Sequence, residues 1–176
     1  IERIVIGTGY KKECYEALCE EYPQIECVYS PRYAETNSMY TLYNCRETIG
    51  DSDFLLLESD IVFNADAVKE MLSDVHENIM LITPVIKFQD QYYVMHDENG
   101  TLVACSTDKD VLDAQGELVG IHRISSPFYH VMCDEYAGIV EEKPKLGYEY
   151  MLLDMSRNKI PVYVLNSSVA KWYEID

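Results

Sequence analysis

The stretch "FLLLESDIVF", Phe54 to Phe63, places two acidic residues directly after an apolar strand. Residues 55–57 are apolar on both faces, which is typical of a central strand in a covered sheet. Glu58 and Asp60 follow two positions apart. In an open parallel sheet ligands bind outside the carboxyl ends of the strands, and residues i and i+2 of an extended chain point to the same side. Either both carboxylates line one crevice, or Asp60 forms a turn and Glu58 is solvated.

The segments around this stretch alternate between strand and helix patterns. Strands are predicted at residues 3–7, 25–30 and 54–57. Helical spacing covers 11–22 and 39–49, and a third helix follows an N-cap at Asn64 and runs to Val75. This alternation favours an α/β fold with a parallel sheet covered on both faces.

The second half carries shorter strands. They are predicted at 79–85, 91–95, 102–106, 116–124 and 160–166, with a hairpin turn at "DENG" and a last strand in "KWYEID". Helices are predicted from "SSPF" at 125–128 onward and at 148–156. No repeat interrupts the chain, so both halves are expected to share one sheet.

Composition narrows the functional classes. The chain has 176 residues, which suits one domain, and its net charge of −17 disfavours nucleic-acid binding. No apolar run reaches the ~18 residues of a membrane span, and no leader pattern is visible, so a cytoplasmic protein is expected. Six cysteines without a CxxC pair predict reduced thiols that act as small apolar residues. Because the first residue is Ile rather than Met and residues 3–7 already look like a core strand, we expect a fragment that something preceded.

The C-terminus repeats the acidic pattern. In "KWYEID", apolar residues lead into Glu174 and Asp176, again two apart. Two aspartates at two strand ends are suitable ligands for one Mg²⁺ ion, which would neutralise phosphate charge. No Ser-His-Asp or Cys-His arrangement is apparent in the sequence.

A set of motifs in order resembles a known family. "IVIGTGYKKECYEAL", "VYSPRYAETNSMYTLYNC", "DFLLLESDIVF", "GELVGIHRIS" and "KWYEID" are similar to the nucleotidyltransferase family with the glycosyltransferase-A-like fold. The "TN" loop and the "YEID" ending resemble the small cytidylyltransferases that act on phosphocholine or 2-aminoethylphosphonate. The resemblance spans nearly the whole chain.

This resemblance implies a fold and a reaction. The fold would be a Rossmann-like three-layer sandwich with a mixed, mainly parallel sheet, as in nucleotide-diphospho-sugar transferases. Residues 1–78 would bind nucleotide and 79–176 the acceptor, within one domain truncated at its N-terminus. A CMP group would pass from CTP, or another NTP, to a small phosphate or phosphonate, with release of pyrophosphate and no covalent intermediate.

The resemblance also implies roles for single residues. Asp60 and Asp176 would be the catalytic Mg²⁺ ligands, whereas Glu58 receives no metal. Tyr33, Thr36 and Asn37 would border the crevice, although Thr36 and Asn37 are equally suited to cap the next helix.

The acceptor half is acidic and rich in tyrosine, and the whole chain has fifteen tyrosines. A cationic amine can bind against aromatic faces, for which Tyr129 and Trp172 are candidates, and Glu149 lies where the family places an acid near the acceptor. Lys143 in "EEKPK" is either a phosphate partner or solvated. The alternative is that most of these aromatic residues pack the core or the sheet edge. The acidic, tyrosine-rich composition favours a zwitterionic aminoalkyl phosphate or phosphonate as the acceptor.

One departure from the family stands out. Its opening glycine-rich signature, "LAAGxGxR…PK", is absent, and Gly7-Thr8-Gly9 does not replace it. We therefore expect this fragment to be weak or inactive alone. Two alternatives stay open, a sugar-1-phosphate nucleotidylyltransferase and a non-catalytic, regulatory nucleotidyltransferase-like domain. A fused domain or a second copy of the chain is a further possible partner.

Overall fold

The structure is a computed structural model that describes residues 1–86 and 91–175. The chain forms two compact units, residues 1–52 with 129–151 and residues 53–128 with 152–176. Helices α5 (Ser126–Ile139) and α6 (Tyr148–Asn158) contribute residues to both units. The predicted functional halves, divided at residue 78, do not coincide with these units.

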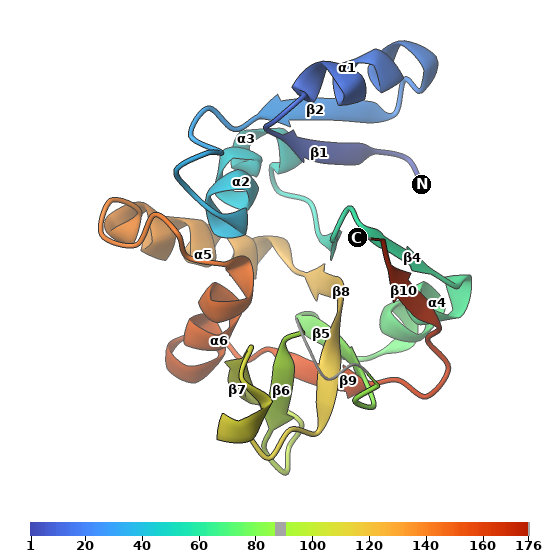
Figure 1. Cartoon of the computed structure of the whole chain (residues 1–176), viewed down its shortest axis with the longest axis vertical. Coiled ribbons are helices and arrows are strands. Elements are labelled where there is room, and N and C mark those ends of the chain that lie inside the picture. The colour runs from blue at the N-terminus through green and yellow to red at the C-terminus, as the bar shows by residue number, and fades with distance from the viewer. Residues whose placement is uncertain (87–90, 176) are drawn as a thin grey trace. The chain divides into compact units, whose positions relative to one another are not determined.

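The first unit begins with a parallel strand pair. Strands β1 (Ile4–Thr8) and β2 (Ile25–Tyr29) are in register from Ile4 opposite Ile25, and α1 (Lys12–Glu21) connects them (Figure 1). The sequence prediction of a strand–helix–strand unit is confirmed. No residue of α1 is buried.

The helix predicted over 39–49 is two helices. Helix α2 (Ser38–Asn44) and helix α3 (Arg46–Ile49) meet at Cys45, whose backbone amide donates to Leu42 O at 3.1 Å. This i to i−3 bond is tighter than an α-helical one and interrupts the regular pattern.

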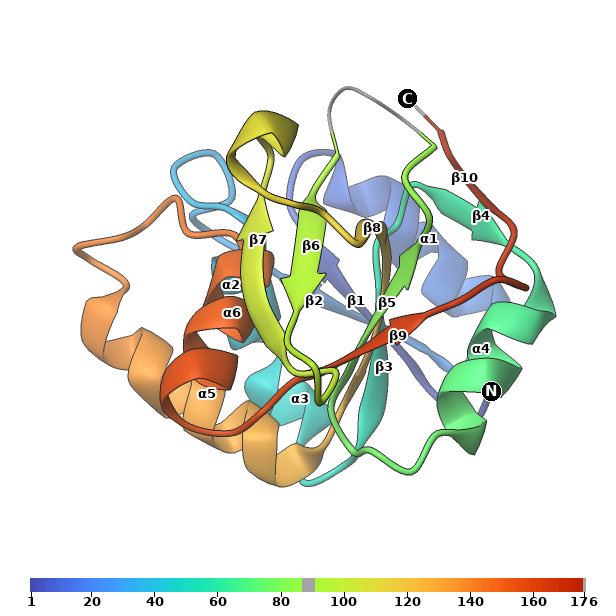
Figure 2. The ribbon, with the colours of Figure 1, turned by 90° about the horizontal axis from the view of Figure 1, so that it is seen from below.

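The second unit contains a mixed six-stranded sheet in the order β7-β6-β8-β5-β9, with β3 on β8 (Figure 2). Its strands are β3 (Phe54–Leu57), β5 (Ile79–Thr83), β6 (Tyr93–His96), β7 (Leu102–Ser106), β8 (Gly116–Ile124) and β9 (Tyr163–Asn166). In the described chain, β3, β5, β6 and β9 run one way and β7 and β8 the other. The mixed α/β class with most strands in one direction is confirmed.

The position of β8 was not predicted. It lies between β3 and β5 and is antiparallel to both. Within the described residues β3 pairs only with β8; three of its residues are half-buried, and Leu57 is 42% exposed. The prediction of a fully buried strand was therefore wrong, because an apolar run does not reveal which of its edges is paired.

A two-stranded ribbon and one helix cover part of this sheet. Strand β10 (Trp172–Glu174) pairs antiparallel with β4 (Ile61–Phe63), a strand the sequence analysis missed, and α4 (Ala65–Ser73) follows β4. The buried cluster beneath them consists of Ala67, Met71, Ile79, Leu81, Val119 and Ile121, against which both strands of the ribbon pack.

Asn64 is the N-cap residue of α4, as predicted, but its side chain makes no capping hydrogen bond and reaches the helix only through the Asp66 carboxylate, at 3.5 Å. The side-chain nitrogen of Asn64 donates to Val169 O at 3.1 Å, and its side-chain oxygen accepts from the backbone amide of Lys171 at 2.9 Å. The side chain thus fixes the approach to β10. A short 3-10 helix (Lys109–Val111) precedes β8.

Candidate active site

Asp60 lies in the tight turn between β3 and β4, and it is exposed. The amide of Ile175 donates to the Asp60 carbonyl at 2.6 Å, extending the β4–β10 pairing in which Glu174 is opposite Ile61. The C-terminal strand is thereby held at the predicted metal ligand. The other predicted ligand, Asp176, lies outside the described residues.

Glu58 rests against a bulge in β8. Its amide donates to Gly120 O at 3.0 Å, and a Cβ added to Gly120 would lie 2.4 Å from Glu58 Oε2. Gly120 has φ of +80°, and the β5–β8 register shifts beside it, between Met80 and Ile82. Bulges often re-aim side chains next to active sites. The carboxylate of Glu58 thus helps to shape this end of the strand.

Trp172 and Glu174 join β10 to the rest of the second unit. The half-buried Trp172 donates its indole N–H to Thr83 Oγ1 at 3.0 Å and packs against the buried cluster. Gln91 donates to a carboxylate oxygen of Glu174 at 2.8 Å. These contacts hold the ribbon in place, and the predicted substrate role of Trp172 stays a prediction.

Tyr33, Thr36 and Asn37 share the loop between β2 and α2 in the first unit. Asn37 is the N-cap of α2 and accepts from the Ser38 amide at 2.8 Å, while the buried Thr36 donates to Arg32 O at 2.7 Å. The capping alternative is confirmed for Asn37. Tyr33 is 40% exposed, and its ring lies edge-on to Tyr29. The predicted nucleotide contacts of this loop stay predictions.

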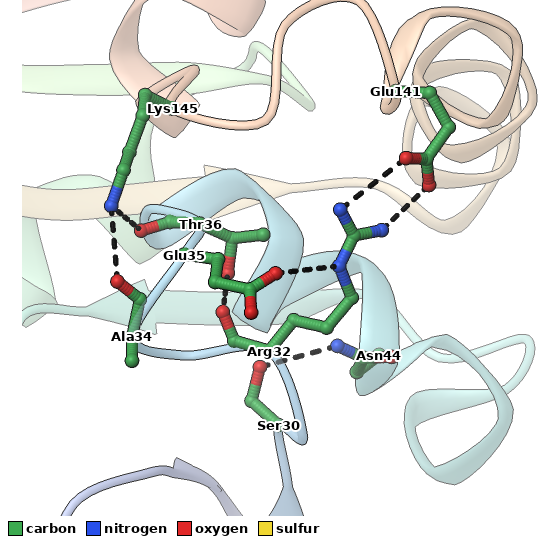
Figure 3. A network of polar contacts seen from close by, with 8 residues as sticks. All are labelled: Ser30, Arg32, Ala34, Glu35, Thr36, Asn44, Glu141 and Lys145. Carbon is green, nitrogen blue, oxygen red and sulfur yellow. Dashed lines mark hydrogen bonds and ion pairs between the residues drawn. The ribbon is translucent and has the colours of Figure 1, made fainter.

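A polar network that the sequence analysis did not anticipate holds this loop, residues 31–37 (Figure 3). Arg32 forms a two-pronged ion pair with Glu141, at 2.6 and 3.3 Å, and also approaches Glu35. Lys145 donates its ammonium group to Ala34 O and Thr36 O at 3.3 and 3.4 Å.

The main chain around Lys145 adds two further bonds. Lys145 O accepts from Asn37 Nδ2 at 3.4 Å, and the Tyr148 amide donates to Ser38 Oγ at 3.0 Å. Residues 141–148 thus support the loop from a distant part of the sequence. The charged runs "PRYAET" and "EEKPK" carried the only sequence signal for this pairing.

Tyr129 and Glu149 are both buried. Burial raises the pKa of Tyr129, and its hydroxyl donates to Leu42 O at 2.6 Å. For Tyr129, this packing suits the alternative that the candidate aromatic residues pack the core or the sheet edge. Glu149 lies in the first turn of α6, and its proposed contact with the acceptor stays a prediction.

Neither a metal-binding cluster nor a membrane-spanning helix is found in the described residues. In the described part of the chain no cluster of three or more His, Cys, Asp or Glu is suited to hold a metal ion, and no helix is long and apolar enough to cross a bilayer. A cavity of about 70 Å³ beside His76 and Tyr163 is far below the ~300–1,000 Å³ of small-molecule sites.

Solved structures share this architecture along the whole chain. The CTP:phosphocholine cytidylyltransferase LicC from Streptococcus pneumoniae has a TM-score of 0.77 at 20% identity, covering 99% of this chain and 73% of LicC. The inositol-1-phosphate CTP transferase from T. maritima has a TM-score of 0.81 at 16% identity, covering 100% and 71%.

This chain has the nucleotidyltransferase fold. HddC from Yersinia pseudotuberculosis is also similar, with a TM-score of 0.67 at 14% identity over 99% of this chain and 73% of HddC. No protein-family model matches the sequence. The fold expected from the ordered motifs is therefore confirmed, while identities of 20% or less leave the reaction to be proposed.

Proposed function

We propose that this chain is a Mg²⁺-dependent nucleotidyltransferase that passes a CMP group from CTP to a small phosphate or phosphonate and releases pyrophosphate. The observation that supports it most is the likeness, along the whole chain, to two solved transferases whose names both specify CTP. The exposed carboxylate of Asp60, beside the C-terminal strand, supports the same reading.

For the proposed ligands Asp60 and Asp176 we propose magnesium rather than zinc. Mg²⁺ binds through one or two carboxylates and completes its shell with water and substrate phosphates, so a cluster of three protein ligands is not required. Asp60 supplies one exposed carboxylate, and we propose Asp176 as the second. When bound, the ion would neutralise charge on the nucleotide phosphates.

The protein's own share in such a transfer is positioning. Phosphoryl-type transfer depends on alignment and electrostatics and needs no protein nucleophile, because the acceptor oxygen attacks the α-phosphorus directly. In the second unit, the β4–β10 pairing fixes the backbone that carries Asp60. In the first unit, Lys145 and the Arg32–Glu141 pair fix the loop that carries Tyr33 and Asn37.

For the acceptor we propose an aminoalkyl phosphate or phosphonate, such as phosphocholine or 2-aminoethylphosphonate. In the first unit, the buried Glu149 would offer a negative charge for the amine and the exposed Tyr33 an aromatic face. In the second unit, the half-buried Trp172 would offer a further aromatic face. Tyr129 is the weakest of the proposed contacts, because its side chain is fully buried.

A pyrophosphate-release assay tests this proposal. The full-length protein that contains this chain is incubated with Mg²⁺, each of the four NTPs, and phosphocholine, 2-aminoethylphosphonate, inositol 1-phosphate or a hexose 1-phosphate. We expect turnover with CTP and one of the two amine acceptors. Turnover with a hexose 1-phosphate alone would refute the acceptor, and no turnover with any pair would favour a non-catalytic domain.

A further inference from the structure

Two cysteines of the first unit lie side by side on neighbouring elements. The Cys19 thiol of α1 donates to the Cys27 sulfur of β2 with the two sulfur atoms 3.6 Å apart, and neither cysteine is in a disulfide. Each is half-buried, so a small reagent can reach the pair. Neither residue takes part in the proposed transfer reaction.

The geometry requires little movement to join them. A disulfide has a sulfur–sulfur distance of ~2.05 Å, so the two atoms must approach by about 1.5 Å. Rotation of the side chains supplies displacements of this size, and α1 carries no buried residue that resists a small shift. We propose that Cys19 and Cys27 are a dithiol modification site that closes to an intramolecular disulfide linking α1 to β2.

The other cysteines lack this combination of access and proximity. Cys14 is exposed on the same helix, but five residues along a helix separate it from Cys19 by about 7.5 Å of rise. Cys45, Cys105 and Cys133 are buried.

A glutathione-type disulfide is the oxidant class for which the reaction balances. The Cys19 thiolate attacks the oxidant, forms a mixed disulfide and releases one glutathione thiol. The Cys27 sulfur then attacks the Cys19 sulfur, loses its proton and releases the second glutathione. Two protein thiols are oxidised to one disulfide while one oxidant disulfide is reduced to two thiols.

The order of attack follows from the surroundings of Cys27. Burial, the adjacent Cys19 thiol and the Glu16 carboxylate raise the pKa of Cys27 to about 11. Cys27 is therefore almost fully protonated at neutral pH and acts second. As long as the pH stays below the pKa of Cys27, its thiolate fraction rises about tenfold per pH unit, and the closing step is expected to accelerate by the same factor.

The experiment treats the whole protein with oxidised glutathione and maps its thiols by mass spectrometry without reduction. We expect loss of two hydrogen atoms, one peptide pair joined through Cys19 and Cys27, and slower amide exchange in α1. Cys14→Ser should leave this product unchanged, whereas Cys19→Ser should retain glutathione on Cys27 or stay unmodified. Stable glutathione adducts on both cysteines of the wild type would overturn the proposal.

A second probe needs no variant. Phenylarsine oxide bridges two adjacent thiols with loss of water, and it should bind once per chain and protect Cys19 and Cys27 from alkylation. Alkylation of both residues after saturating arsenical would show that the thiols do not approach each other and would equally overturn the proposal.

Discussion

The amide of Ile175 and the carbonyl of Asp60 are joined by a hydrogen bond of 2.6 Å, although the two residues are 115 positions apart in the sequence. This bond continues the antiparallel pairing of β10 with β4. It places the end of the "KWYEID" motif at the turn that closes "FLLLESDIVF".

The first prediction concerns Asp60. Asp60→Asn removes one negative charge and the proposed metal ligand from an exposed turn, so we expect pyrophosphate release to fall by about 100-fold or more while the free energy of unfolding changes little. The matched control is Glu98→Gln, which removes one exposed charge from the hairpin turn after β6. An active Asp60→Asn enzyme would refute the metal assignment.

The second prediction concerns the bulge at Gly120. Gly120→Ala places a Cβ on a residue with a φ of +80°, only 2.4 Å from Glu58 Oε2. Urea unfolding should therefore show that the free energy of unfolding falls by about 1–3 kcal/mol. Gly138 in α5 has no atom within 4 Å of an added Cβ, so Gly138→Ala should instead stabilise by about 0.5–1 kcal/mol. Equal effects of the two substitutions would contradict this account of the bulge.

The third prediction concerns Lys145. Lys145→Met removes the donor to Ala34 O and Thr36 O, so the amides of Tyr33, Glu35 and Thr36 should exchange with solvent faster. Lys143→Met is the control, because it removes the same charge from an exposed lysine two residues earlier in the chain. If both variants exchange like the wild type, Lys145 does not hold the loop.

The fourth prediction concerns pH. Burial lowers the pKa of His122 to about 3, whereas an unfolded histidine titrates near ~6.5. The unfolded state therefore binds the proton first as pH falls below ~6.5, and His122 should cost about 2 kcal/mol of stability at pH 5. This loss continues towards pH 3 and is absent above pH 7.

Denaturant unfolding at pH 7 and pH 5 measures that dependence. The difference in the free energy of unfolding between pH 7 and pH 5 should shrink in His122→Leu and persist in His130→Gln, because the His130 side chain is 48% exposed and not buried. An unchanged difference in His122→Leu would assign the pH dependence to other groups.

Local pattern alone determined much of this protein. The strands at 54–57, 102–106 and 116–124 begin and end as predicted, because apolar runs bounded by turn residues define them. The strand–helix–strand start and the cap position of Asn64 follow from helical spacing. The ordered motifs also led to the fold that the solved structures share.

Only the tertiary structure decided which distant segments meet. Placing β8 between β3 and β5 depends on which strand edges exchange hydrogen bonds, and side-chain periodicity carries no record of that choice. For the same reason Lys145 could not be assigned to the loop at Ala34, nor Cys19 to Cys27, from sequence spacing. The sequence determined the chemical groups and the elements that carry them, whereas long-range backbone pairing determined their neighbours.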